Sequence, residues 1–112
     1  MITDNTSHVL ETDAEGYLID PAEWDEAAAE QLAQGEGIVL TEQHWQVIRF
    51  MRSYFDEHQV AADVRHVIKH LDNDLGYGKQ GRDLIFKLFP YGYVKQACKI
   101  AGMKRPRGWS TG

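Results

Sequence analysis

Short amphipathic segments, each followed by glycine or proline, constrain the fold of this chain more than any other feature. In the clearest segment, residues 41–57, apolar side chains recur at helical spacing along one stripe, and Thr41 stands where an N-terminal cap is expected. Gly or Pro lies after the other periodic segments and would end each helix. The sequence therefore predicts a mainly α fold with helices over about 21–34, 41–57, 60–75, 82–89 and 93–101.

The N-terminal segment has a pattern typical of a β-hairpin. Two short apolar runs, 9–10 and 17–19, flank a polar turn that ends at Gly16, which can adopt the positive φ of a bulged turn. An isolated hairpin is marginally stable in water, so it must dock on other elements. With 112 residues the chain is the size of one domain. We predict a single domain, 1–102, in which a hairpin at about 8–19 packs on a helical bundle at about 21–101.

Charge is distributed unevenly along the chain. Residues 1–78 carry four basic and sixteen acidic side chains, and residues 79–112 carry eight basic and one acidic. The formal net charge of −5 excludes a generally basic, DNA-coating protein. The basic C-terminal part suits an acidic partner, a phosphate or an oxyanion, or its charge helps the two parts of the chain meet in the fold. Because Pro, Gly and charge dominate residues 103–112, we expect a mobile C-terminal arm there.

Several classes of protein do not fit the sequence. No stretch approaches the roughly 18 apolar residues of a membrane-spanning helix, and the first ten residues lack a signal-peptide pattern. A single cysteine, Cys98, cannot form an internal disulfide. We expect a cytoplasmic protein with a reduced thiol and no membrane association.

Metal and phosphate sites are not expected. His66 and His70 have the i, i+4 spacing of zinc ligands, but the apolar pattern places both on a solvated helix face and no third ligand is evident. The glycines of 76–81 match GxGxxG, yet they follow a predicted helix rather than a strand, which indicates a helix–helix connection. The sequence therefore predicts no cofactor and no metal.

Cys98 is the best chemical candidate in the sequence. A thiolate is the nucleophile and sulfur acceptor, and Lys95 and Lys99 would be its helical neighbours. A position near a helix C-terminus disfavours the anion, and the alternative is a small buried thiol beside Ala97 and Ala101. Both interpretations remain open from the spacing alone.

Nucleic-acid binding is a further hypothesis. Several short helices with a basic end could form a helix-turn-helix whose C-terminal part meets phosphates. Asp63, Asp72 and Asp74, at the ends of the third predicted helix, argue against it, and no Arg/Asn/Gln-rich face suggests base reading.

Four blocks occur in order along the chain: ETDAEGYL (11–18), LTEQHW (40–45), LFPYG (88–92) and KQACKIAG (95–102). Together they resemble the DsrC/TusE family, over about residues 9–109. The resemblance implies small sulfur-carrier proteins rather than classical enzymes. It also implies an orthogonal helical bundle with a helix-turn-helix-like unit, an N-terminal hairpin and a flexible C-terminal arm.

The resemblance also implies partners. DsrC proteins carry sulfur as partners of dissimilatory sulfite reductase, of which DsrC is also called the gamma subunit. TusE proteins pass persulfide sulfur from a TusBCD-type complex towards thiolation of the tRNA wobble uridine. By this resemblance, the chain is expected to meet a TusBCD/DsrEFH-type complex and either dissimilatory sulfite reductase or a tRNA thiolation enzyme.

One departure from the family pattern concerns the sulfur-bearing residues. DsrC has a cysteine in the KQAC block, matched by Cys98, and a penultimate arm cysteine that would fall at position 109, where this chain has Trp109. Cys98 is then the only possible persulfide acceptor, and the alternative is a regulatory or docking paralogue that binds nucleic acid or a sulfur-enzyme complex. The residues predicted to bind partners are Lys95, Lys99, Lys104, Arg105, Arg107 and Trp109.

Overall fold

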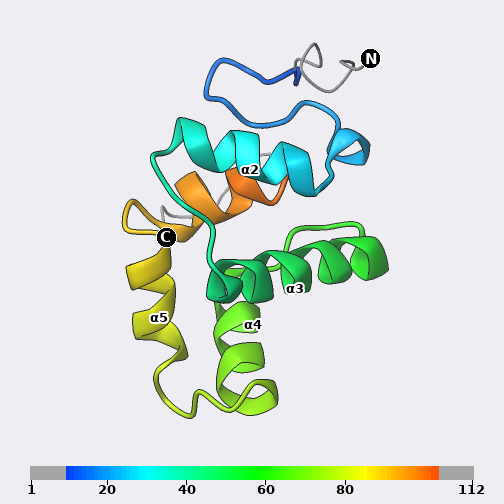
Figure 1. Ribbon diagram of the computed structural model, residues 1–112. Helices are drawn as coiled ribbons and strands as arrows, with labels where there is room; N and C mark the ends of the chain where they lie inside the picture. Colours follow the sequence, from blue (N-terminus) through cyan, green and yellow to red (C-terminus); the bar gives the residue numbers. More distant parts are fainter. Residues whose placement is uncertain (1–9, 104–112) are drawn as a thin grey trace.

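The computed structural model describes residues 10–103, which are mainly helical (Figure 1). The predicted mainly α fold is confirmed. In chain order the elements are the 3-10 turn η1 (Pro21–Glu23), α2 (Glu26–Gly35), α3 (Glu42–His58), α4 (Val64–Lys69), the π-helical turn η2 (His70–Asp74), α5 (Gly81–Leu88) and the π-helical segment η3 (Tyr93–Cys98).

The helix predicted over 21–34 is divided in two. Asp20 accepts a hydrogen bond from the Ala22 backbone N–H at 3.0 Å and caps η1. Asp25 then caps α2 by accepting from the Ala28 N–H at 2.7 Å. Each aspartate starts its own helical element, because its side chain accepts from a backbone N–H of the first turn. The backbone is extended at Trp24 and Asp25, and this break separates η1 from α2.

The helix predicted over 41–57 corresponds to α3, whose first turn is held by a capping box. The backbone N–H and hydroxyl of Thr41 lie 3.0 and 2.8 Å from Nδ1 of His44. A backbone N–H can only donate, so Nδ1 accepts and Nε2 carries the hydrogen, which it donates to the Leu88 carbonyl oxygen at 3.0 Å. Burial lowers the pKa of His44, the Leu88 hydrogen bond opposing it in part. The buried ring is therefore held in its neutral form.

Replacing His44 should change how stability depends on pH. The folded-state pKa lies below the ordinary value of 6.5, so the unfolded chain binds more protons as pH falls below about 6.5. Stability contributed by neutral His44 is present above this pH and lost below it. His44→Gln keeps a capping-box residue without a titrating group. Urea unfolding measures the free energy of unfolding at pH 7.5 and at pH 5.5. Between these two pH values the wild type should lose more of this free energy than His44→Gln does. Equal losses in the two proteins would contradict the prediction.

Helices α4 and α5 lie side by side, with α3 packed against α4 (Figure 1). Asp63 caps α4 by accepting from the backbone N–H groups of Arg65 and His66. The third helix therefore begins later than the predicted 60 and continues through η2. Residues 75–80, which include Gly76 and Gly78, connect η2 to α5, as the sequence predicted, and Gly81 is the first residue of α5.

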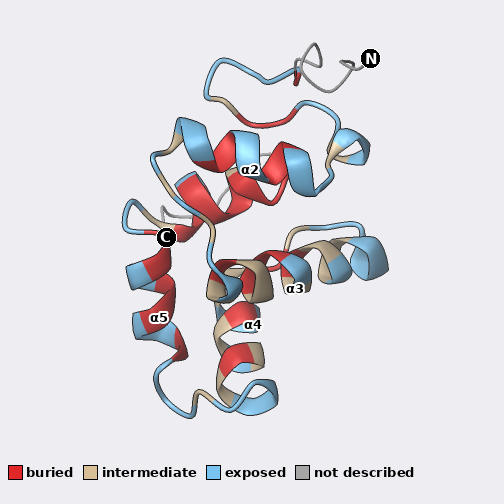
Figure 2. Ribbon diagram, viewed as in Figure 1, coloured by how far each residue is buried: buried red, intermediate tan, exposed pale blue. Residues whose placement is uncertain are grey.

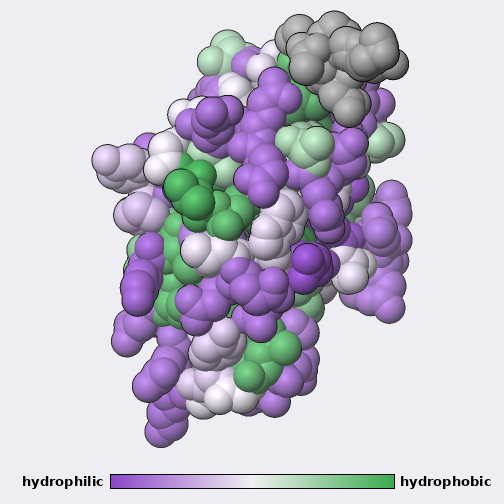
Figure 3. Space-filling view, in the orientation of Figure 1, coloured by the Kyte–Doolittle hydropathy of each residue, from purple (hydrophilic) through white to green (hydrophobic). Residues whose placement is uncertain are grey.

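The core lies where the inward faces of these helices meet (Figure 2). The face drawn in Figure 3 is mostly hydrophilic, and its hydrophobic residues form separate patches. Among the described residues the largest fully buried side chains include Leu18, Ile48, Met51, Leu71, Phe89, Tyr93, Ile100 and Met103.

The predicted N-terminal β-hairpin is wrong within the described residues. One isolated antiparallel bridge, Thr12 to Leu18, forms there and no strand does. Gly16 does adopt a positive φ of 90°. Tyr17 and Leu18 are successive and both buried, whereas a strand would point them to opposite faces. The segment is thus a tight loop docked on the helices, with the Tyr17 hydroxyl donating to the Val94 carbonyl at 2.9 Å.

The predicted arm, 103–112, lies outside the described residues except for Met103, which is buried rather than part of a mobile arm. Residues 8–9 of the predicted hairpin also lie outside the described residues. Within 10–103, no helix combines the length and apolar character needed to cross a membrane.

Candidate functional site

Cys98 is the last residue of η3 and has no solvent-exposed surface. Burial raises the pKa of its thiol to about 12, and a hydrogen bond with the Tyr93 side chain acts in the opposite direction. At neutral pH this thiol is therefore protonated, and the protonated form is a poor nucleophile and sulfur acceptor. Of the two interpretations left open by the sequence, the buried thiol is the one observed in this conformation.

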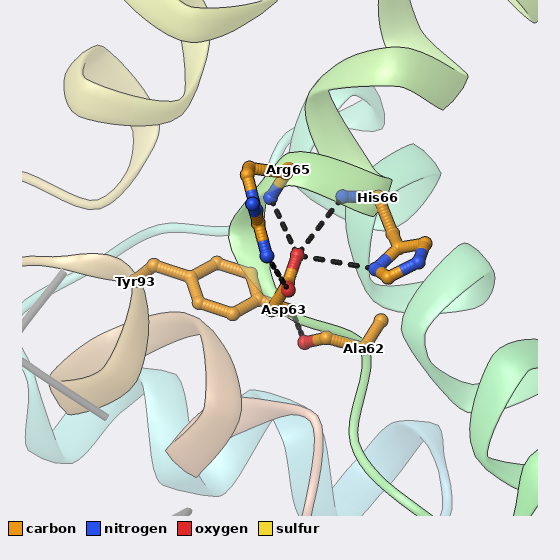
Figure 4. Close-up of polar contacts among 5 residues, drawn as sticks. All are labelled: Ala62, Asp63, Arg65, His66 and Tyr93. Carbon is orange, nitrogen blue, oxygen red and sulfur yellow. Dashed lines mark hydrogen bonds and ion pairs between the residues drawn. The ribbon is translucent and has the colours of Figure 1, made fainter. Parts of the chain in front are cut away.

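Tyr93 links the thiol to the start of α4, because its side chain contacts both Cys98 and Ala62. Its hydroxyl donates to the Ala62 carbonyl oxygen at 2.6 Å, just before the Asp63 cap of α4 (Figure 4). Burial raises the pKa of Tyr93 well above its ordinary value, so the phenol stays neutral and remains a donor. The ring begins η3 and is 2% exposed. Tyr93 thus ties the thiol-bearing segment to the start of α4.

A second set of contacts fixes the chain just after Cys98. The indole Nε1 of Trp24 donates to the Ile100 carbonyl at 2.9 Å. Arg52 donates to the carbonyls of Ala101 and Pro21, both at 3.1 Å, and its guanidinium lies 4.7 Å from the Trp24 ring centroid. Gly102 follows at a φ of +78°, and a Cβ there would lie 2.5 Å from Trp24 Cδ1. We call Trp24, Arg52 and Gly102 the C-terminal clamp.

The clamp places Met103 in the core as well. Its backbone N–H donates to the Cys98 carbonyl at 2.9 Å, and its side chain is 1% exposed. Reagents can therefore reach Cys98 only if the segment from η3 to Met103 moves away from Trp24 and Ala62.

The structure does not gather the predicted lysines around the thiol. Lys95 is exposed. Lys99 lies 2.9 Å from a Glu36 carboxylate oxygen, its side chain is 16% exposed, and its ammonium lies 5.2 Å from the Tyr17 ring centroid. Lys99 therefore fastens η3 to the end of α2 and to the N-terminal loop. The other predicted partner-binding residues, Lys104, Arg105, Arg107 and Trp109, lie outside the described residues.

The two histidines differ in exposure. The His66 side chain is 50% exposed, as predicted for a solvated face, whereas that of His70 is 23% exposed, so the prediction is wrong for His70. His70 stacks on Phe50 of α3 with ring centroids 4.3 Å apart, and His66 lies 5.1 Å from Tyr54. The cause is that α3 carries aromatic side chains on the flank that faces α4. Among residues 10–103, no group of three or more His, Cys, Asp and Glu side chains is arranged to hold a metal ion.

Sequence reasoning missed Tyr93, Trp24 and Arg52 as determinants of the site. Arg52 lies on the apolar stripe of α3, and a charged residue on such a stripe signals a buried polar contact. Tyr93 and Trp24 carry no local signal, since their partners are 31 and 76 residues away.

Comparison with known proteins extends over nearly the whole chain. Residues 5–109 match the family described as DsrC like protein. Sulfurtransferase TusE of Pectobacterium atrosepticum is 44% identical over 97 residues, which is 87% of this chain and 89% of the relative. Sulfurtransferase TusE of Escherichia coli is 40% identical over 97 residues, with the same coverage.

Solved structures agree with the sequence comparison. The oxidized gamma-subunit of the dissimilatory sulfite reductase (DsrC) from Archaeoglobus fulgidus superposes with a TM-score of 0.77 at 40% identity, covering 90% of this chain and 92% of that one. DsrC of Allochromatium vinosum gives a TM-score of 0.78 at 38% identity, covering 90% of each chain.

Proposed function

This chain belongs to the DsrC-like protein family, and from that premise we propose that it is a sulfur-relay protein of the DsrC/TusE type. The observation that carries the proposal is the match over residues 5–109, which includes the Cys98 block. Relatives at 40–44% identity are named sulfurtransferase TusE, and the similar solved structures are DsrC.

Cys98 is the sulfur-bearing residue in this proposal, because it is the only thiol in the chain. The Cys98 thiolate attacks the terminal sulfur of a donor persulfide, R–S–SH. A new S–S bond forms at Cys98 as the donor S–S bond breaks. The donor leaves as a thiolate that takes up the proton lost by Cys98, and no external oxidant is required. A sulfur acceptor later reverses the exchange.

Loading requires the thiol to leave its observed position. The step needs a thiolate and an approach path, and Cys98 has neither while Tyr93 and the C-terminal clamp are in place. We infer that sulfur transfer proceeds from an opened form in which the segment 93–103 has separated from Trp24 and Ala62. A partner that binds this form would promote opening by mass action.

The partners follow from the family. We propose that the chain meets a TusBCD/DsrEFH-type donor complex, and that dissimilatory sulfite reductase or a tRNA thiolation enzyme receives the sulfur. Lys95, together with Lys104, Arg105, Arg107 and Trp109, would form the partner-binding surface, with Trp109 as an aromatic anchor. Lys99 is held by Glu36 in the closed form and would join this surface only after opening.

Intact-protein mass spectrometry tests the proposal. After incubation with a small persulfide donor, the wild type should gain the mass of one sulfur atom, and reduction should remove it. Cys98→Ser should gain nothing, because the variant has no thiol. A gain on both proteins, or none on wild type under conditions that load a two-cysteine relative, would contradict sulfur carriage by Cys98.

The buried thiol favours one alternative, a docking or regulatory paralogue that binds a sulfur-enzyme complex or nucleic acid without carrying sulfur. It keeps the family fold and uses Cys98 only for packing. Unloaded wild-type protein that still binds a relay complex would support this alternative.

A further inference from the structure

A groove that Tyr93 also lines lies between α4 and α5. Its cavity volume is about 460 Å³, within the range of pockets that bind small ligands. Its apolar lining, which we call the floor, comes from Val64 and Ile68 of α4, Ile85 and Phe86 of α5, and Tyr93. Phe86 is 52% exposed, which is unusual for a large aromatic side chain.

Two arginines stand at the rim, one from each helix. The Arg65 side chain is 86% exposed, and its guanidinium donates to a carboxylate oxygen of Asp63 at 3.1 Å. Figure 4 shows this ion pair. The guanidinium of Arg82 lies 5.9 Å from the Phe86 ring centroid and has no carboxylate partner among the described residues. Guanidinium groups bind carboxylates in a planar, bidentate manner. The groove thus offers an apolar floor beneath cationic edges.

Charge decides between possible occupants. The arm of this chain carries Lys104, Arg105 and Arg107, so the rim arginines would repel it. Nucleic acid is also disfavoured, because residues 61–90 carry five basic and four acidic side chains and offer little net charge to phosphates. An acidic protein segment with a large apolar side chain matches both the floor and the rim.

We propose that the α4–α5 groove is a docking site for an acidic partner segment that inserts an aromatic or aliphatic anchor between Arg65 and Arg82. The anchor fills the floor around Phe86, and flanking carboxylates pair with the two guanidiniums. None of these contacts involves the Cys98 thiol, so docking in the groove is independent of sulfur chemistry at Cys98.

Chemical-shift titration of the isotope-labelled full chain tests the proposal, with the capped peptide Glu-Glu-Leu-Phe-Glu-Glu as probe. Saturable shifts should appear on α4 and α5 and at Tyr93. Arg82→Glu and Phe86→Ser should each weaken binding at least about fivefold, because the first reverses one of the two rim charges and the second removes the aromatic side chain of the floor. Lys87→Glu, the same charge change on α5 outside the groove, should weaken it less than about twofold.

Two control peptides separate the contribution of the apolar anchor to binding from that of the flanking carboxylates. Glu-Glu-Ser-Ser-Glu-Glu lacks the anchor and Lys-Lys-Leu-Phe-Lys-Lys reverses the charge, so both should bind more weakly than the probe. No saturable shift at millimolar probe, or equal losses for Lys87→Glu and Arg82→Glu, would overturn the proposal. Tighter binding of a short DNA duplex to the same residues would also overturn it. So would self-association that Arg82→Glu abolishes, because a second copy would then be the occupant.

Discussion

Iodoacetamide should alkylate native Cys98 at least about a hundredfold more slowly than the same thiol in the urea-unfolded chain. Burial raises the pKa of Cys98 from an ordinary 9.0 to about 12, so the thiolate fraction at pH 8 falls by about three orders of magnitude. The higher intrinsic nucleophilicity of a more basic thiolate recovers part of that loss. Complete burial adds to the protection, because the reagent must wait for the segment 93–103 to open.

The measurement is a time course of single alkylation by mass spectrometry at pH 8, with and without urea. A small cysteine-containing peptide, run in both buffers, corrects for the effect of urea on the reagent. Rates that agree within about tenfold would contradict a closed, protonated thiol.

Gly102→Ala should destabilise the fold by about 2–4 kcal/mol. The φ of +78° at Gly102 is a left-handed conformation that costs a residue with a Cβ about 1–2 kcal/mol. The added Cβ would also lie 2.5 Å from Cδ1 and 2.9 Å from Cγ of Trp24, so the indole must move. Its hydrogen bond to the Ile100 carbonyl and its contact with Arg52 would then weaken.

Urea unfolding gives this free energy, and Gly35→Ala provides the matched control. Gly35 ends α2, and a Cβ there meets nothing within 4 Å, so its replacement should be neutral or slightly stabilising. Gly102→Ala should also alkylate at Cys98 faster than wild type, since the clamp holds the thiol-bearing segment closed. If Gly102→Ala lowered the free energy of unfolding by less than about 0.5 kcal/mol, or left the alkylation rate of Cys98 unchanged, the clamp would not be what holds this segment closed.

Local chemistry explains which parts of the fold could be predicted. The α3 cap at Thr41 and the apolar stripe after it are set by neighbours within a few residues. The hairpin prediction failed because the apolar pairs around the turn pack on helices rather than on each other. Tyr17 contacts Val94, 77 residues away, and this tertiary contact outweighs strand pairing.

The candidate site was predictable only in part. The sequence identifies Cys98 and its position near the end of the last helix. It does not identify Tyr93 and the C-terminal clamp, which hold the thiol-bearing segment in its buried position. Lys99 is one residue from Cys98, yet it pairs with Glu36, 63 residues away, so proximity along the helix did not produce a cationic environment. The clamp likewise joins Trp24, Arg52 and Gly102, whose contacts depend on how η1, α3 and the C-terminal segment pack.

Persulfide loading followed in time by intact-protein mass spectrometry, with wild type and Gly102→Ala side by side, tests the central claim most directly. The account predicts one added sulfur on each protein, absent in the corresponding Cys98→Ser variants, with Gly102→Ala loading faster in proportion to its faster alkylation. Loading of the opened variant and wild type at the same rate would contradict gating by the clamp. Absence of any added sulfur on either protein would contradict sulfur carriage by Cys98 itself.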